Sequence, residues 1–221
     1  MRQIPRFLTR SSLVMYVIVT VPFMTVFIKN DYARFVYMET VSHWYSRIRP
    51  PSYVFIGDSI TAGGRNWGWR LHGNPLASRN LAGNGYTTAQ IASQVKIALA
   101  YSPDYVLVMA GTNDILNGAP PEVAVREYRK LLQSFAGTAA QPIITLMPHQ
   151  ASSAYQETTE EFNRAIRDLA TGMEVEWLDL NPKIAPSGQL LPQYSTDGVH
   201  FSDAAYRVWC EEILRVLNRP D

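Results

Sequence analysis

Residues Tyr53-Val54-Phe55-Ile56-Gly57-Asp58-Ser59-Ile60-Thr61 form the stretch that decides the fold. The four apolar or aromatic residues 53–56 predict a buried β-strand, and Gly57 breaks the run. A turn then holds Asp58 and Ser59, and the residues after it can begin a helix. Ligands of an open α/β sheet bind at the carboxyl ends of its strands, so the Ser59 hydroxyl is a candidate for chemistry. Taken alone, Gly-Asp-Ser is far more often a turn with an N-cap serine than a nucleophile.

From Ser52 onward, apolar strands alternate with amphipathic helices. The further strand candidates are 79–82, 104–110, 142–147 and 174–180. Apolar residues at helical spacing mark three helices between them and a fourth that begins at Ser202 as N-cap and buries Tyr206, Trp209, Cys210, Ile213, Leu214 and Leu217. Strands separated by helices predict a parallel sheet covered on both faces. One domain, residues 51–221, accounts for the whole pattern.

Composition excludes several classes of function. The 221 residues are 47% apolar, enough for one substantial core. Twenty basic and nineteen acidic residues give a formal charge of +1, which provides no electrostatic argument for binding nucleic acid. The one cysteine, Cys210, excludes an intrachain disulfide framework and a cysteine-based metal cluster, and its place in the last helix predicts a small core residue. The sequence contains no Walker loop, Gly-x-Gly-x-x-Gly, His-Glu-x-x-His or Gly-x-Ser-x-Gly motif.

The N-terminal part predicts a membrane anchor. A basic tail, 1–10, carries three arginines, and residues 13–28 that follow contain no charge. We expect residues 11–29 to form an uncleaved single-pass transmembrane helix, with the rest of the chain on the non-cytoplasmic side, periplasmic or extracellular. The alternative is a signal peptide whose cleavage releases a secreted protein, although no small-x-small cleavage site follows the apolar run. Residues 30–50 are expected to be a connector that ends at two prolines.

Three later stretches carry chemistry that fits Ser59. The segment Asn80 to Thr88 is a glycine-containing turn before a helix, and Gly85 can expose backbone N–H groups to an anion. Gly111-Thr112-Asn113-Asp114 ends the third strand, which places the Asn113 amide at the same sheet edge as the serine. Asp197-Gly198-Val199-His200 precedes the last helix, where the aspartate can hold Nδ1–H of the imidazole and leave the other nitrogen to act as a base.

Each of these stretches also has an ordinary structural interpretation. Gly85 alone is more often a turn residue, Asp114 fits an N-cap or turn, and Asp-x-x-His alone is slightly more often a solvated loop. The combination is much stronger than its parts, because all the candidates fall at strand ends or in the loop before the last helix.

On these motifs the chain resembles the SGNH hydrolases, also called the GDSL esterase/lipase family. The first block is matched by Gly57-Asp58-Ser59-Ile60-Thr61, with Ile60 where the family name has leucine. Gly85 matches the glycine of the second block, although Ala82 stands where many members have another glycine. The segments 111–114 and 197–200 match the third and fifth blocks, so the resemblance covers about residues 52–217.

The resemblance implies a flavodoxin-like three-layer α/β/α sandwich with a five-stranded parallel sheet in the order 2-1-3-4-5. It implies Ser59 as nucleophile, His200 as base and Asp197 as the residue that orients the base. It also implies an oxyanion hole formed by the backbone N–H groups of Ser59 and Gly85 and the side-chain amide of Asn113. No metal or organic cofactor is expected, and esters or thioesters fit better than peptides as substrates.

The substrate is open at this point. A small acyl ester, short-chain or acetyl, or an acylated glycan or lipid would suit the site. Two other functions share the same residues: an acyltransferase that passes the acyl group to a sugar hydroxyl, and a membrane-tethered binding module without activity.

Several other side chains near the predicted catalytic edge have no assigned role. Trp67, Trp69 and Arg65 follow the nucleophile closely and would suit a pocket for sugars or a polar head group, whereas Trp67 and Leu71 also fit an i,i+4 core pair. His149 follows the fourth strand and reaches the same edge, but nothing in its pattern assigns it a catalytic part.

Overall fold

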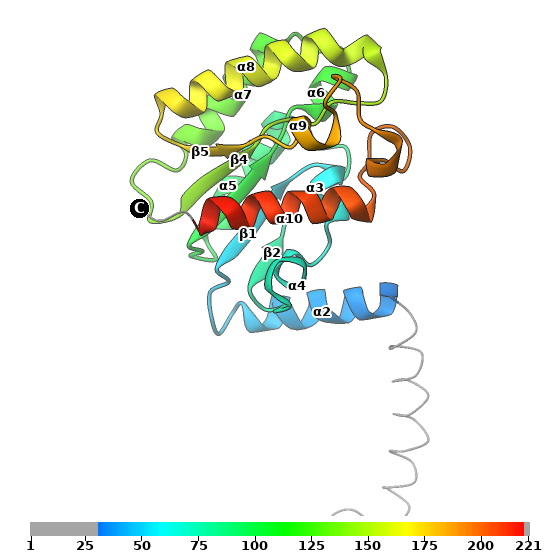
Figure 1. The fold of residues 1–221 in the computed structure, drawn as a ribbon. Coiled ribbons are helices and arrows are strands. Elements are labelled where there is room, and N and C mark those ends of the chain that lie inside the picture. The colour runs from blue at the N-terminus through cyan, green and yellow to red at the C-terminus, as the bar shows by residue number, and fades with distance from the viewer. Residues whose placement is uncertain (1–30, 219–221) are drawn as a thin grey trace, which may run out of the picture.

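The computed structural model describes residues 31–218, and its centre is one sheet of five parallel strands (Figure 1). The strands are β1 (Tyr53–Gly57), β2 (Ser78–Asn80), β3 (Tyr105–Met109), β4 (Gln141–Thr145) and β5 (Glu176–Leu178). Their order across the sheet is β2-β1-β3-β4-β5, as predicted. All five predicted strands exist, although several are shorter than expected, and the second lies at Ser78–Asn80 rather than 79–82.

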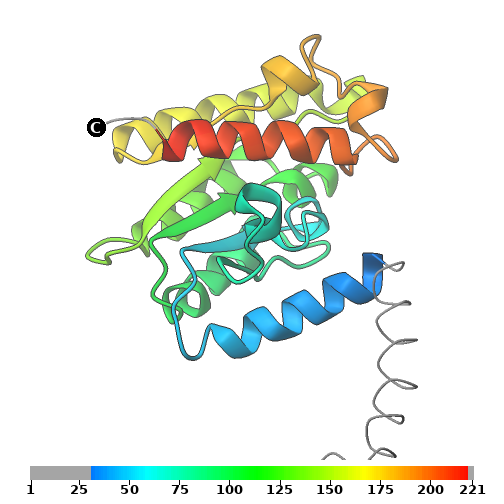
Figure 2. The same cartoon turned by 60° about the horizontal axis from the view of Figure 1, so that its bottom comes forward.

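Helices cover both faces of the sheet and give three layers (Figures 1 and 2). One face carries α5 (Thr88–Leu99), α7 (Pro121–Gln133) and α8 (Gln156–Gly172). The other carries α3 (Ser59–Gly63), α4 (Trp67–His72), α9 (Asn181–Ile184) and α10 (Asp203–Leu217). The short helix α6 (Thr112–Leu116) follows β3, and two 3₁₀ turns lie at Ser153–Tyr155 and Pro192–Tyr194. The predicted three-layer sandwich is confirmed.

Successive side chains of β1 point to opposite faces of the sheet, and both faces are covered by helices. Val54 and Ile56 pack into the core under α5, α7 and α8, while Phe55 points into the core under α10. All three side chains are fully buried. A parallel strand between two helical layers has no polar face, so its sequence is a continuous apolar run.

An aromatic cluster fixes α10 against the sheet. The Trp67 ring stacks on Phe55 with centroids 4.5 Å apart, and Trp209 of α10 meets Trp67 edge-on at 4.7 Å. The indole N–H of Trp209 donates to Thr145 Oγ1 at 2.9 Å, so the one polar group of this buried ring has a hydrogen-bond partner. Trp67 and Leu71 are both buried, which confirms the core-pair interpretation.

Burial along α10 differs in part from the prediction. Tyr206, Trp209, Cys210 and Ile213 are buried as expected, whereas Leu214 and Leu217 are only half-buried. Val216 and Glu212 are buried in addition, and the Glu212 carboxylate pairs with Lys183 and Arg215.

The segment 30–50 is not a connector throughout. It contains α2 (Asp31–Tyr45), which lies along the edge strand β2 (Figures 1 and 2). The buried Ser42 hydroxyl donates to the carbonyl of Ser78 at 2.8 Å, and Glu39 pairs with Arg79 at 3.3 Å. Both of these contacts with the edge strand are polar, so they give no apolar pattern from which the helix could be predicted. The two prolines end the segment without preventing a helix before them.

The expected anchor, residues 11–29, lies outside the described residues. Within residues 31–218, no helix combines the length and the apolar character that crossing a bilayer requires.

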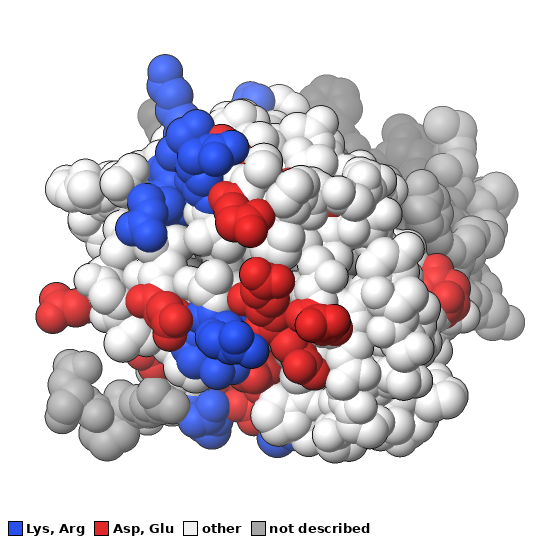
Figure 3. Space-filling view, turned by 90° about the horizontal axis from the view of Figure 1, so that it is seen from above, with Lys and Arg blue, Asp and Glu red and all other residues white. Residues whose placement is uncertain are grey.

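The surface over α7 and α8 carries charges of both signs. Figure 3, which views this side of the molecule from above, shows basic and acidic side chains close together. Ion pairs made by residues of these two helices include Lys130–Glu127 at 2.8 Å and Arg167–Asp179 at 3.6 Å. This mixed pattern agrees with the formal charge of +1.

Candidate active site

Ser59 stands at the carboxyl end of the central strand β1, as the first residue of α3. Asp58 caps this helix, because its Oδ1 accepts the Ile60 N–H at 2.9 Å. Gly57 is required for the tight turn, since a Cβ there would collide with the Thr61 side chain and lie 2.9 Å from the Met109 carbonyl oxygen. The turn leaves the Ser59 side chain half-buried at the sheet edge.

The Asp58 carboxyl group is buried directly beside the serine. Burial raises its pKa to about 6, and the hydrogen bond from the Ile60 N–H opposes that rise. Its second oxygen, Oδ2, has no hydrogen-bond partner. Asp58 is therefore a structural cap whose ionisation is costly in the folded protein.

His200 and Asp197 lie where the sequence predicted a base and its partner. Ser59 Oγ and His200 Nε2 are 2.9 Å apart, and His200 Nδ1 is 2.6 Å from Asp197 Oδ2. Asp197 Oδ1 also accepts the backbone N–H groups of His200 at 2.7 Å and Val199 at 3.0 Å. The His200 backbone N–H, followed by the His200 side chain, lowers the pKa of Asp197 to about 2. The aspartate is thus an anion at neutral pH, and Nδ1 is held as a donor.

Contacts with α10 and with Ala151 hold the loop that carries His200 in place. Phe201 is buried against Trp209 and Tyr206 of α10, with ring centroids 5.8 and 5.7 Å away. The Gly198 carbonyl accepts the Ala151 N–H at 2.8 Å, and Gly198 adopts φ +92°, a conformation that glycine provides without strain. The imidazole is consequently positioned by the core as well as by Asp197.

Gly85 and Asn113 line the same cavity as Ser59 and His200. Gly85 is exposed in a turn with φ +75°. Asn113 is the second residue of α6, and its Nδ2 donates to the Tyr86 carbonyl at 3.0 Å. A side-chain amide has two N–H donors, so a second one remains for a ligand. The structure therefore brings all five predicted site residues together.

Asp114 has the structural role that its turn position indicated. Its buried Oδ2 accepts both the backbone N–H of Thr88 at 2.8 Å and the Thr88 hydroxyl at 2.9 Å. This contact joins α6 to the start of α5 and leaves Asp114 outside the reacting centre.

The cavity that Ser59 and His200 line has a volume of about 1060 Å³, and its wall also includes residues that the sequence did not indicate. Glu39 of α2 lines it, although it precedes the predicted domain. Burial raises the pKa of Glu39 to about 7, with Arg79 opposing the rise. No local pattern could have indicated Glu39, because its place in the wall depends on the docking of α2.

His149 does not belong to this cavity. It is buried, its backbone N–H donates to Asn181 Oδ1 at 2.9 Å, and burial lowers its pKa. Within the part of the chain that the structure describes, no group of three His, Cys, Asp or Glu side chains is arranged to hold a metal ion.

A family model described as GDSL-like lipase/acylhydrolase matches residues 55–208, from β1 into α10. The chain belongs to this family. Members of the GDSL family are carboxylic ester hydrolases, and this protein is one of them.

Solved structures of GDSL-family proteins share the fold. A GDSL-like lipase from Bacteroides thetaiotaomicron superposes with a TM-score of 0.66 at 19% identity, over 83% of this chain and 98% of that one. A lipolytic G-D-S-L protein from Veillonella parvula gives 0.65 at 20%, over 76% and 98%. The acetylxylan esterase Axe2 from Geobacillus stearothermophilus gives 0.59 at 17%, over 78% and 96%. At these identities the similarity establishes the fold alone.

A sequence similarity also relates the chain to a larger protein. The N-acylneuraminate cytidylyltransferase of Streptococcus agalactiae is 22% identical in an alignment of 183 positions that covers 76% of this chain. The chain spans 41% of that protein's length, so the match does not assign cytidylyl transfer to this chain.

Proposed function

We propose that this GDSL-family protein is a serine esterase that hydrolyses short-chain acyl esters, most suitably acetyl esters. The observation that carries the proposal is the continuous chain of contacts from Ser59 Oγ to His200 Nε2 at 2.9 Å and from His200 Nδ1 to Asp197 Oδ2 at 2.6 Å. In this proposal Ser59 is the nucleophile, His200 the general base and Asp197 the residue that orients the base.

The first step is acylation of the serine. His200 Nε2 accepts the Ser59 hydroxyl proton as Oγ attacks the ester carbonyl carbon, and the resulting imidazolium is stabilised by the Asp197 carboxylate. Collapse of the tetrahedral intermediate breaks the bond to the alcohol oxygen, which takes the proton from Nε2. A water molecule then repeats the sequence on the acyl-enzyme and releases the carboxylic acid.

The charge that develops on the carbonyl oxygen requires donors fixed in advance. We propose that the backbone N–H groups of Ser59 and Gly85 and the Asn113 side-chain amide provide them. The positions of all three residues on one cavity wall support this role. Ser59 is also at the N-terminus of α3, where the first backbone N–H groups have no partner within the helix. One such donor lowers the barrier by about 2.7–4 kcal/mol.

Two observations support short acyl groups and water as the acceptor. The acetylxylan esterase among the structural neighbours acts on an acetyl ester, as its name states. The exposed positions of Asp197 and Gly85 leave the cavity open to solvent, so water has access to an acyl-enzyme. An acyltransferase would need to exclude that water.

A chain-length series of aryl esters tests the proposal. We expect acetyl and propionyl esters to be cleaved fastest, and Ser59→Ala to abolish turnover. Ser93→Ala, which removes an exposed serine hydroxyl on α5, is the matched control and keeps wild-type rates. A preference for long acyl chains refutes the substrate class. Acyl transfer to an added sugar in place of acetate release identifies a transferase, and no turnover at all identifies a binding module.

We also propose that residues 11–29 anchor the domain 51–221 to a membrane from its non-cytoplasmic side. The support is the uncharged run behind three arginines in the N-terminal tail. Extraction with alkaline carbonate should leave the protein in the membrane fraction, whereas release of a shortened chain would identify a cleaved signal peptide.

A further inference from the structure

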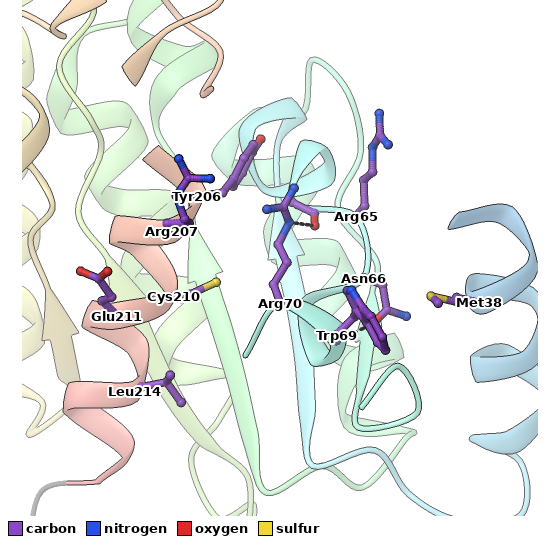
Figure 4. A pocket seen from close by; sticks show the side chains of 11 residues that line it. Met38, Arg65, Asn66, Trp69, Arg70, Tyr206, Arg207, Cys210, Glu211 and Leu214 are labelled. Atoms are coloured by element: carbon purple, nitrogen blue, oxygen red, sulfur yellow. Dashed lines mark hydrogen bonds between the residues drawn. The ribbon is translucent and has the colours of Figure 1, made fainter. Parts of the chain in front are cut away.

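A second cavity, of about 610 Å³, lies between α2, α4 and α10, beside the catalytic one. Figure 4 shows its lining side chains. The guanidinium groups of Arg65, Arg70 and Arg207 lie toward one end of the view, and the apolar side chain of Leu214 and the ring of Trp69 lie toward the other. The cavity thus combines a basic end with an apolar end.

The lining carries more basic than acidic side chains, and the acid that pairs with Arg70, Asp203, is not among the lining residues. Three arginines contribute to the lining and one acid, Glu211, does so. They come from three separate elements: Arg65 follows α3, Arg70 belongs to α4 and Arg207 belongs to α10. Bringing like charges together is unfavourable, and an anion bound between them would relieve that repulsion.

Arg70 is the fixed member of this group. Its Nε donates to the Gly64 carbonyl at 2.7 Å, its guanidinium lies 4.7 Å from the centre of the Tyr206 ring, and it pairs with the exposed carboxylate of Asp203 at 3.0 Å. Its positive charge reaches the inner wall: burial raises the pKa of Tyr206, and Arg70 is the largest of the influences that oppose the rise, with Arg65 a smaller one. Arg70 therefore shapes the cavity, while Arg65 and Arg207 extend from its rim with exposed side chains.

Arg65 connects this cavity to the catalytic one, since it lines both. Its backbone adopts φ +60°, which is unfavourable for a residue with a side chain. The Asn80 side-chain amide holds that conformation by donating to the Arg65 carbonyl at 2.9 Å. The Arg65 side chain is thus kept at the boundary between the two cavities by a strained and specifically bonded turn.

We propose that the cavity between α2, α4 and α10 binds an anionic group, a phosphate or carboxylate, carried on the alcohol portion of the ester substrate, with Arg65 and Arg207 as specificity-determining residues. This inference rests on the proposed esterase function. The acyl group occupies the catalytic cavity beside Ser59, and the anionic alcohol extends past Arg65. Trp69, which is 53% exposed, offers its ring to an apolar or sugar part of the same alcohol.

Two aryl acetates that differ by one phosphate group test the inference on the full-length protein. Phenyl acetate is neutral, and 4-acetoxyphenyl phosphate carries the anion on the leaving alcohol. We expect wild-type kcat/KM to favour the phosphate ester. Arg65→Gln and Arg207→Gln should each lower the ratio of the two kcat/KM values by about ten-fold, since each removes a charge-assisted hydrogen bond, with the change mainly in KM. Arg126→Gln, which removes the same charge from an exposed site on α7, should leave both values unchanged.

A binding measurement separates this inference from the esterase proposal. Ser59→Ala protein is titrated with phenyl phosphate in a calorimeter at low salt, with and without the Arg207→Gln change. Weaker binding in the double variant supports the site even if the chosen esters are poor substrates. Equal binding by both proteins, or an unchanged ratio of kcat/KM values in both arginine variants, overturns the inference while leaving the esterase proposal standing. Absence of turnover by the wild-type protein counts against the esterase proposal alone.

Discussion

Replacing Asn113 by alanine tests the proposed oxyanion hole, because the two N–H groups of its side-chain amide have different roles that can be measured separately. One N–H of its amide donates to the Tyr86 carbonyl at 3.0 Å, and the other is available to the substrate. Loss of the first bond should lower the free energy of unfolding by about 1 kcal/mol, the usual net value for a neutral hydrogen bond. Loss of the second should raise the barrier by about 2.7–4 kcal/mol, which is a fall of about 10²–10³-fold in kcat.

The assay measures both quantities on the same protein preparation. Steady-state hydrolysis of an acetyl ester gives kcat and KM, and urea unfolding gives the stability. Because the oxyanion exists only in the transition state, KM should change little. A variant of Asn113 that keeps kcat within about three-fold of wild type while losing stability would refute the reasoning, since the fall expected for a lost oxyanion donor is at least about 10²-fold. Asn113 would then be a turn residue whose bond to Tyr86 is its whole function.

Three further predictions concern the site and the turns that support it. Ser59→Ala and His200→Ala should each lower kcat by about 10⁴-fold or more, and initial rates of the double variant should be little lower; multiplied losses would contradict a single catalytic unit. Asp58→Asn should flatten part of the pH dependence of urea unfolding. The pKa of Asp58 is raised from 3.8 to about 6, so the folded protein binds more protons than the unfolded chain between those values, and its stability falls by about 3 kcal/mol as pH rises through that range. An unchanged slope in Asp58→Asn would show that Asp58 ionises normally. Gly111→Ala should cost about 2–4 kcal/mol in urea unfolding, because its φ is +114° and a Cβ would collide with the Phe162 ring, whereas Gly118→Ala, with φ +78° and open space, should cost about 1 kcal/mol; equal costs would exclude the collision.

The sheet could be predicted because strands that are buried on both faces have continuous apolar sequences. β1 and β3 are continuous apolar runs for that reason. The edge strand β2 is Ser78-Arg79-Asn80, with no apolar residue, so its predicted position was displaced toward Leu81. Its boundaries depend on pairing with β1 and on the contact with α2, which no local pattern records.

The candidate site was predictable where turn chemistry and strand ends coincide, as for Ser59 and Asn113. The residues that line the cavities around the site could be predicted only in part. Of the aromatic residues near the nucleophile, Trp67 is fully buried and Trp69 is 53% exposed on the second cavity. Which of the two rings is buried depends on which side of α4 faces the core, and the sequence alone does not indicate that. Glu39, which lines the cavity of Ser59, and Arg207, which lines the second cavity, come from opposite ends of the chain, and nothing in their neighbouring residues indicates these positions.

The distance along the chain between Ser59 and His200 has a consequence for biosynthesis. The two side chains in contact are 141 residues apart, and the bond from the Tyr206 hydroxyl to the Ile60 carbonyl spans 146. Ribosomes add roughly 5–20 residues per second, so the serine leaves the tunnel on the order of 10 s before its partner is made. During that interval neither the Ser59–His200 contact nor the packing of α10 can exist. Activity, on the proposed mechanism, therefore begins only after the last helix is complete.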